Sequence, residues 1–121
     1  VNTIPNTVAR HWQTIINSMV NVVHNPQGTA RSSGIDSDYL FAGKTGTAQV
    51  VGIAQDEEYD QEELAKELHD HAWFIAFAPA ENPIISVVIL VENGGSGSSS
   101  AAPIARQLFD HYISKSNRQS G

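Results

Sequence analysis

The sequence predicts an α+β fold, in which an antiparallel sheet of three strands is packed by an N-terminal and a C-terminal amphipathic helix. Apolar residues recur at helical spacing near both ends of the chain, and three extended stretches lie between them. With 121 residues, 40% of them hydrophobic and 17% charged, the chain has the composition of a single globular domain. We therefore expect residues 1–121 to form one segment without internal repeats.

The first predicted element is a helix that follows Pro5. Asn6 or Thr7 can cap its first turn, and the sequence HNPQG from His24 onward ends it. Its apolar positions follow a helical period and predict a core-facing side: Val8, Trp12, Ile15, Ile16, Met19, Val20 and Val23. Residues 28–39, GTARSSGIDSDY, are rich in glycine, serine and aspartate and are expected to form a loop.

Residues 39–54 favour an extended strand, and the glycines in it suggest that another group approaches its backbone closely. An acidic insertion follows over residues 55–71. Eight of the thirteen acidic residues lie in this insertion, and residues 61–69 within it predict a short, mostly solvated helix. The acidity of the protein therefore belongs largely to one insertion.

The stretches AWFIAFAP and IISVVILVE, joined by a turn, predict a β-hairpin whose continuous apolar character favours burial on both faces. The sequence NGGSGSSS is expected to be a flexible connection into a helix that is capped near Ser99 or Ser100 and has Pro103 in its first turn. The predicted buried face of this helix holds Ala101, Ile104, Ala105, Leu108 and Tyr112. Residues 115–121 are expected to be a frayed polar tail.

The bulk composition excludes several classes of function. A formal net charge of −6 and a pI near 5.1 argue against a nucleic-acid partner. The chain has no cysteine, which excludes disulfides, thiolate zinc sites and cysteine nucleophiles. No apolar run approaches the roughly 20 residues of a membrane span, and no signal peptide is recognisable at Val1, so we expect neither within the chain.

One candidate motif is GKT, Gly43 to Thr45, which matches the end of a phosphate-binding loop. The first glycine of such a loop falls at Asp38, whose negative charge suits phosphate poorly, and the following residues resemble a strand rather than a helix. The run GGSGSSS likewise resembles a dinucleotide-binding loop but has Ser100 at the third glycine position. A nucleotide-binding domain is therefore the less favoured alternative.

The other interpretation treats KTGT as an active-site strand. Thr45 and Thr47 project to one face, where their hydroxyls can bind a substrate carboxylate, and Gly46 leaves the backbone between them approachable. Lys44 supplies positive charge, but strict alternation places it on the opposite face, so it can share their site only at the rim of a cleft or on a twisted strand. For KTGT alone, a solvated lysine in a threonine-rich edge strand is the simpler interpretation.

Histidine and tryptophan side chains suggest further sites. His69 and His71 flank Asp70, and both can bind one metal ion only if the chain is extended there, so we expect no metal site and no other cofactor. Of the remaining side chains of these types, we expect the histidines on the surface and the tryptophans in the core: His11, His24, His111, Trp12 and Trp73.

Four stretches in this order resemble the C-terminal part of the transpeptidase domain of class B penicillin-binding proteins. They are GTA (28–30), AGKTGTAQ (42–49), HAWFIAFAPAENP (71–83) and VENGGSGSSSAAPIARQLFDHY (91–112). Within that family the chain is most similar to the elongation type, penicillin-binding protein 2 of Gram-negative bacteria. The resemblance covers nearly all of residues 8–114 and implies that the three strands belong to a larger five-stranded sheet.

The resemblance also implies an activity, that of a peptidoglycan D,D-transpeptidase acylated by β-lactams. It implies that Lys44 polarises a serine of a second motif and attracts the substrate's terminal carboxylate. The hydroxyls of Thr45 and Thr47 would hold that carboxylate beside Gly46, and the backbone N–H of Thr47 would be a donor to the oxyanion. The implied ligands are a peptidoglycan stem peptide or a β-lactam.

The chain departs from the family in lacking two of its motifs. No Ser-x-x-K, Ser-x-Asn or Ser-x-Asp occurs in it. By resemblance these motifs lie upstream of Val1, so we expect a C-terminal segment that is inactive alone and needs the upstream part of the same domain. A non-catalytic module that binds β-lactam or stem peptide is the alternative. The family implies a membrane-anchored parent at the periplasmic face of the inner membrane, working with cell-elongation partners.

Overall fold

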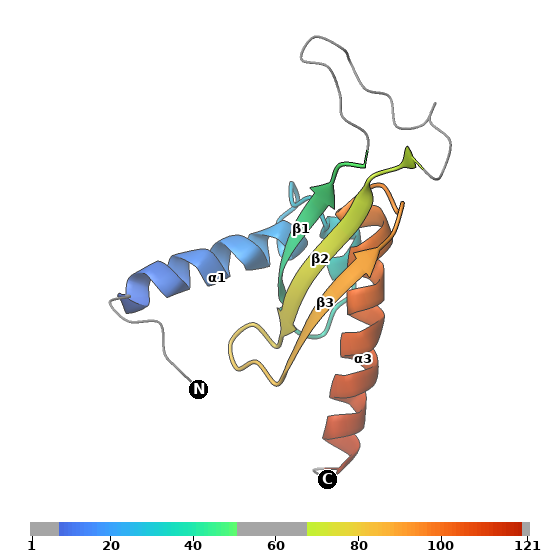
Figure 1. Ribbon diagram of the computed structural model, residues 1–121. Coiled ribbons are helices and arrows are strands. Elements are labelled where there is room, and N and C mark those ends of the chain that lie inside the picture. Colours follow the sequence, from blue (N-terminus) through green and yellow to red (C-terminus); the bar gives the residue numbers. More distant parts are fainter. Residues whose placement is uncertain (1–7, 51–67, 120–121) are drawn as a thin grey trace.

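The computed structural model describes residues 8–50 and 68–119, which form a three-stranded sheet with helices toward both ends of the chain (Figure 1). Along the chain the elements are α1 (Ala9–His24), α2 (Arg31–Gly34), β1 (Ala42–Ala48), β2 (His71–Ala78), β3 (Ile85–Val91), the π-helical turn η3 (Gly97–Ala101) and α3 (Ala102–Gln119). The strands are antiparallel in the order β1-β2-β3. The predicted α+β fold is confirmed, and so is the predicted order of its terminal helices and three strands.

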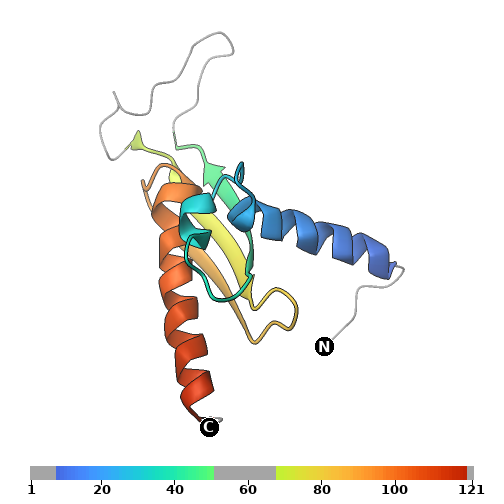
Figure 2. The same ribbon diagram turned by 180° about the vertical axis from the view of Figure 1, so that it is seen from behind.

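The helices cover the sheet unequally. α3 lies along one face of the sheet, whereas α1 extends away from the β1 side, as the views from front and back agree (Figures 1 and 2). The rings of Phe41, in the segment before β1, and Phe109, in α3, meet edge to face with 5.4 Å between their centroids. The largest fully buried side chains are Phe41, Phe74, Phe109 and Val23. The core therefore lies between the sheet and α3.

The β2–β3 hairpin is confirmed, but the prediction that both of its faces are buried is wrong for the described residues. Side chains alternate along β2, so that Ala72, Phe74, Ala76 and Ala78 are buried while Trp73 and Ile75 on the other face are 38% and 45% exposed. In β3, Val88 is 66% exposed. Among the described elements, α3 and η3 pack on one face only, so Trp73 does not lie in the core as predicted.

The buried face of α3 differs from the predicted one. Ala101 and Ala105 are buried as expected, but the other buried residues here are Ala102 and Phe109, and Ile113 packs partly buried against the same cluster. The other three residues of the predicted face are exposed: Ile104, Leu108 and Tyr112. The helix carries apolar residues on two adjacent stripes, and the stripe that contains Phe109 faces the sheet. α3 also continues to Gln119, so the expected fraying from residue 115 is not seen up to that point.

α1 begins at Ala9 with Val8 as its N-cap, which makes no side-chain capping bond, and the predicted capping residues Asn6 and Thr7 lie outside the described residues. Its end at His24 is as predicted. Val23 is the only buried residue of this helix, while Trp12 is 40% and Ile15 is 50% exposed. The predicted core-facing side therefore reaches the core only at its C-terminal end, where the helix passes β1 and α2.

Two segments predicted as loops contain helical turns. Residues 28–39 include α2, and the connection after β3 includes η3. A Cβ added to Gly97 of η3 would lie 2.2 Å from the carbonyl oxygen of Trp73 and 2.8 Å from that of Gly46, so this turn packs tightly on the sheet instead of being flexible. The predicted helix at 61–69 and strand residues 51–54 lie almost wholly outside the described residues. None of the helices in 8–50 and 68–119 has the length and hydropathy of a bilayer span.

Candidate active site

The KTGT sequence lies in β1, which is an edge strand within the described part of the chain. Its partners in β2 are Ile75 for Lys44, Phe74 for Thr45 and Ala72 for Thr47. Residues directly opposite each other in a sheet point to the same face. The two threonines therefore share the α3 face with Phe74, and Lys44 shares the other face with Ile75, as the alternation predicted.

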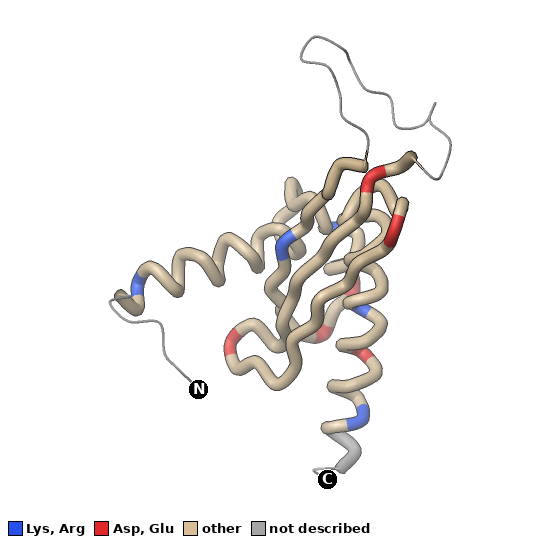
Figure 3. Tube along the Cα trace, in the orientation of Figure 1, with Lys and Arg blue, Asp and Glu red and all other residues tan. Residues whose placement is uncertain are grey.

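The side chain of Lys44 is exposed, and its Nζ donates a hydrogen bond of 2.5 Å to the carbonyl oxygen of Thr45. It borders an open groove of about 460 Å³ between α1 and the sheet, whose lining is Thr14, Ile15, Ser18, Met19, Val22, Lys44 and Ile75. Among the described residues of this lining, Lys44 is the charged one. Most residues of the three strands are uncharged (Figure 3). An ammonium group beside an apolar wall favours an anion that also carries apolar surface.

The glycines of β1 mark close approaches, as the sequence predicted, and the structure identifies the approaching groups. A Cβ on Gly43 would lie 2.3 Å from Cζ of Phe74, so the absence of a side chain there makes room for that ring. The backbone of Gly46 is approached by Gly97 of η3. The Gly43-Lys44-Thr45 sequence lies within a strand instead of at the start of a helix, so the phosphate-loop interpretation is wrong.

Asp70 fastens the end of β1 to the start of β2. Its buried carboxylate accepts a hydrogen bond of 3.1 Å at Oδ1 from the backbone N–H of Val50, and its carbonyl accepts one of 2.8 Å from the N–H of Gly95. The neighbouring histidines bind Asn93: His71 Nδ1 accepts the backbone N–H at 2.9 Å, and the carbonyl of His69 accepts from Nδ2 at 2.9 Å. The HDH sequence thus connects three chain segments. No group of three metal-ligating side chains occurs among the residues that the structure describes.

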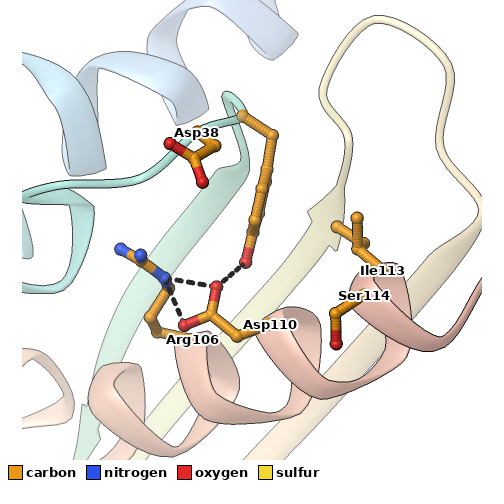
Figure 4. Close-up of a pocket in the computed structure, with 6 residues that line it drawn as sticks. Asp38, Arg106, Asp110, Ile113 and Ser114 are labelled. Atoms are coloured by element: carbon orange, nitrogen blue, oxygen red, sulfur yellow. Dashed lines mark hydrogen bonds and ion pairs between the residues drawn. The ribbon is translucent and has the colours of Figure 1, made fainter. Parts of the chain in front are cut away.

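The segment that enters β1 is fastened by Arg106 of α3 (Figure 4). The Nε of Arg106 donates to both carboxylate oxygens of Asp110, at 2.8 and 2.9 Å, and the hydroxyl of Tyr39 donates to Oδ1 of Asp110 at 2.7 Å. The terminal nitrogens of Arg106 donate at 3.0–3.1 Å to the carbonyls of Ser33, Ile35 and Asp36. Burial and the Asp110 carboxylate raise the pKa of Tyr39, so its hydroxyl keeps its proton at neutral pH.

His24 forms a third attachment near the start of β1. Its Nε2 accepts a 3.1 Å hydrogen bond from the backbone N–H of Phe41, and the two rings meet edge to face with 5.2 Å between centroids. Accepting this bond requires an unprotonated nitrogen. Burial, followed by the positive charge of Arg106, lowers the pKa of His24. His24 is therefore half-buried and structural, contrary to its predicted place on the surface, whereas His11 and His111 are exposed as predicted.

Asp70, Asn93 and Arg106 were missed by reasoning from sequence. Asp70 and Arg106 reach segments that are 20 and about 70 residues away along the chain, and no local pattern reports such contacts. A weak signal existed for Asn93, whose φ of 52° is a conformation that asparagine tolerates better than most residues. The predicted residues Lys44, Thr45, Gly46 and Thr47 all lie consecutively in β1, with the threonines and the lysine on opposite faces.

Comparison with known proteins places these features in a family. Residues 4–110 match the family described as the penicillin binding protein transpeptidase domain. The peptidoglycan D,D-transpeptidase MrdA of Haemophilus influenzae is 47% identical over 104 residues, which are 86% of this chain and 16% of that protein. The chain therefore spans about a sixth of the length of this curated relative.

Solved structures show the same similarity. The PBP2 of Pseudomonas aeruginosa, crystallised in complex with WCK 5153, is 42% identical with a TM-score of 0.70, over 92% of this chain and 21% of that one. The PBP2 of Helicobacter pylori, in a complex with MreC, is 30% identical with a TM-score of 0.72, over 87% of this chain and 17% of that one.

Proposed function

Because the chain belongs to the penicillin-binding protein transpeptidase domain family, we propose that it forms one wall of the active site of a peptidoglycan D,D-transpeptidase. The resemblance seen in the sequence motifs is confirmed by relatives named MrdA and by structures of PBP2. In the proposed reaction a serine is acylated by a D-Ala-D-Ala stem peptide with loss of the last alanine. An amine of a second peptide then releases the acyl group and forms the cross-link.

The observation that carries this proposal is the placement of KTGT on an edge strand. Lys44 lies on one face of β1 and the two threonines on the other, so their side chains can act on one ligand only where both faces meet, along the free edge of the strand. A substrate lying along this edge would place its carboxylate near the hydroxyls of Thr45 and Thr47. Its acyl oxygen would accept a hydrogen bond from the backbone N–H of Thr47.

Lys44 has two roles in the proposed site. Its ammonium group attracts the terminal carboxylate of the substrate and polarises the serine of the second family motif. Both roles require an exposed side chain, and Lys44 is exposed and, among the described residues, donates its hydrogen bond to an adjacent backbone carbonyl. Such a bond is easily exchanged for one to a ligand or to a second hydroxyl, because the geometry of a flexible lysine is not fixed by it.

The nucleophile must come from a different segment, since no Ser-x-x-K and no Ser-x-Asn or Ser-x-Asp occurs in the chain. Residues 1–121 are thus proposed to be a C-terminal segment of a longer domain, in which further strands complete the sheet. Exposed apolar side chains support this, because a protein surface rarely leaves so many of them together: Trp73, Ile75, Val88 and Leu90 lie on the sheet face away from α3. The chain alone is proposed to be inactive.

The proposed ligands and partners follow from the same family. The stem peptide is the substrate, and a β-lactam acylates the same serine as its mimic. The Helicobacter pylori relative was solved in a complex with MreC, which supports a partnership of the parent protein with cell-elongation machinery. Because the substrate is peptidoglycan, the proposed place of action is the periplasmic face of the bacterial inner membrane, with the parent anchored there.

The proposal is tested with a chimera in which this chain replaces the matching segment of the Haemophilus influenzae relative. The chimera and the 121-residue chain alone are incubated with a fluorescent penicillin and separated on a denaturing gel. We expect label on the chimera and none on the chain, since a covalent adduct needs the serine. Label on the isolated chain would show a nucleophile within it. A chimera that melts cooperatively but takes no label would instead favour a module that binds without catalysis.

A further inference from the structure

Asp70 is a buried residue that connects separate segments of the chain and has no part in the proposed catalytic roles. The side chain of Asp70 is 6% exposed, and it lies between the end of β1 and the turn that leads from β3 to η3. Its Oδ1 holds Val50, and its carbonyl holds Gly95. One residue thus joins two segments that are 45 residues apart, and a side-chain atom forms the contact with the first of them.

Both segments border the backbone of Gly46 and Thr47. The ladder between β1 and β2 pairs Thr47 with Ala72 and ends where Ala48 meets His71. The bond from Val50 to Asp70 continues this pairing beyond the last residues of the strands. On the other side, the turn held by Asp70 leads directly to Gly97, whose close approach covers the backbone of Gly46.

An oxyanion donor works only when it is fixed in direction before the reaction. Removal of one such donor costs a factor of about 10² to 10³ in rate, and a displacement of about 1 Å can cost about 10²-fold. The N–H of Thr47 lies three residues before Val50, near the end of an edge strand that has a neighbour on only one side among the described elements. A strand end of this kind frays unless something beyond the ladder holds it.

We propose that Asp70 is a positioning residue, whose buried carboxylate holds the end of β1 and thereby fixes the direction of the Thr47 backbone N–H toward the acyl oxygen. This inference rests on the proposed function. Asp70 touches no reacting atom in this scheme, and it acts through Val50 and through the turn at Gly95. Its removal is therefore expected to slow acylation while leaving the initial, non-covalent binding of a β-lactam nearly unchanged.

The test uses Asp70→Ala and Asp70→Asn in the chimera, with Tyr39→Phe as a matched control. Tyr39→Phe removes a hydrogen bond near the other end of β1. Rapid-mixing kinetics with a chromogenic cephalosporin separate the dissociation constant from the acylation rate constant. We expect Asp70→Ala to lower the rate constant by about 10- to 100-fold and to change the dissociation constant less than about threefold. Asp70→Asn, which keeps an oxygen for the Val50 N–H, should recover most of the rate.

A second variant and a second measurement distinguish a loss of positioning from misfolding of the Asp70→Ala variant. Val50→Pro removes the donor of the same hydrogen bond and should slow acylation in the same way as Asp70→Ala. Hydrogen exchange of the backbone amides over residues 45–50 should be faster in both variants but not in Tyr39→Phe. Unchanged exchange, or acylation by Asp70→Ala at the original rate, would overturn the inference. If the unsubstituted chimera takes no label, the proposed function fails, while hydrogen exchange still decides whether Asp70 orders the strand.

Discussion

The two faces of the sheet are covered very differently. Toward α3 the side chains of β2 are closed off by the helix and η3, and none of these four is more than 4% exposed: Ala72, Phe74, Ala76 and Ala78. On the opposite face, four large apolar side chains of β2 and β3 are between 38% and 66% exposed: Trp73, Ile75, Val88 and Leu90. Among the described residues, one face of the sheet thus packs into a core, and the other leaves large apolar side chains exposed.

We expect the covered face to contribute mainly to stability and the open face mainly to ligand binding. The covered face contains the aromatic core around Phe74 and Phe109, which holds the strands in register. The open face contains Lys44, whose charge has no place in a core. Since Thr45 and Thr47 belong to the covered face, β1 presents groups from both faces at one edge. In the proposed site, the covered side of the sheet thereby positions Thr45 and Thr47, and the open side contributes Lys44.

The largest expected effect comes from deleting a ring on the covered face. Phe74→Ala should lower the free energy of unfolding of the chain by about 3–5 kcal/mol, because it leaves a cavity beside Gly43 and under α3. Ile75→Ala, one residue away on the open face, should cost only about 1 kcal/mol or less. Urea unfolding followed by tryptophan fluorescence measures both. Equal losses would mean that the two faces are covered alike in solution.

The open face is expected to matter for chemistry rather than for stability. In the chimera, Lys44→Ala should lower the rate of penicillin acylation by at least about a hundredfold, since proton transfer and charge stabilisation by one positioned group typically contribute that much. Lys115→Ala removes an exposed lysine from α3 and is the matched control, with an unchanged rate. Thermal unfolding of both variants should match the unsubstituted protein, and a large loss of stability in Lys44→Ala alone would contradict the separation.

Local sequence signals were sufficient to locate the helices and strands, but they were insufficient to predict which face of each element is buried. Two apolar stretches joined by a turn located the hairpin, and periodicity located α1 and α3, because the spacing of apolar residues reports amphipathic helices directly. It misjudged α3 because Leu108 and Phe109 are adjacent and both apolar, and only the packing partner decides which one faces inward. The continuous apolar strands predicted burial on both faces, a pattern that fits a sheet covered by more chain than the described residues provide.

The site shows the same division. Lys44, Thr45, Gly46 and Thr47 are contiguous, but KTGT alone favoured a solvated lysine, and the resemblance of four ordered stretches was needed to select these residues as candidates. The alternation of a strand gave their faces. The supporting contacts join distant positions, such as Val50 with Asp70 and Arg106 with the loop at Ile35, and each depends on the folded arrangement. The sequence of Asp70 between two histidines suggested metal binding more readily than it suggested the observed hydrogen bond to Val50.

A smaller effect is expected where α3 holds the segment that enters β1. Tyr39→Phe removes the hydroxyl that donates to Asp110 and should lower the free energy of unfolding by about 1 kcal/mol. Tyr112→Phe, on the exposed side of α3, is its matched control and should change the stability little. The two variants are compared by their midpoints of urea unfolding, at an unchanged slope of the unfolding free energy against urea concentration. If the two variants lose the same stability, the Tyr39 hydroxyl contributes nothing specific.

The smallest expected effect is a pH dependence confined to the covered side. The pKa of His24 lies below its ordinary value of 6.5, so near that pH the unfolded chain binds a proton there more readily than the folded chain does. The contribution of His24 to stability is complete above pH 6.5 and is lost as the pH falls through the lowered value. Unfolding free energies between pH 7.5 and 5.5 should therefore fall less steeply in His24→Gln, whose side chain does not titrate, than in the unsubstituted chain. His111→Gln, at an exposed histidine of α3, should keep the original slope, and a slope that His24→Gln leaves unchanged would mean that His24 is not held neutral beside Phe41.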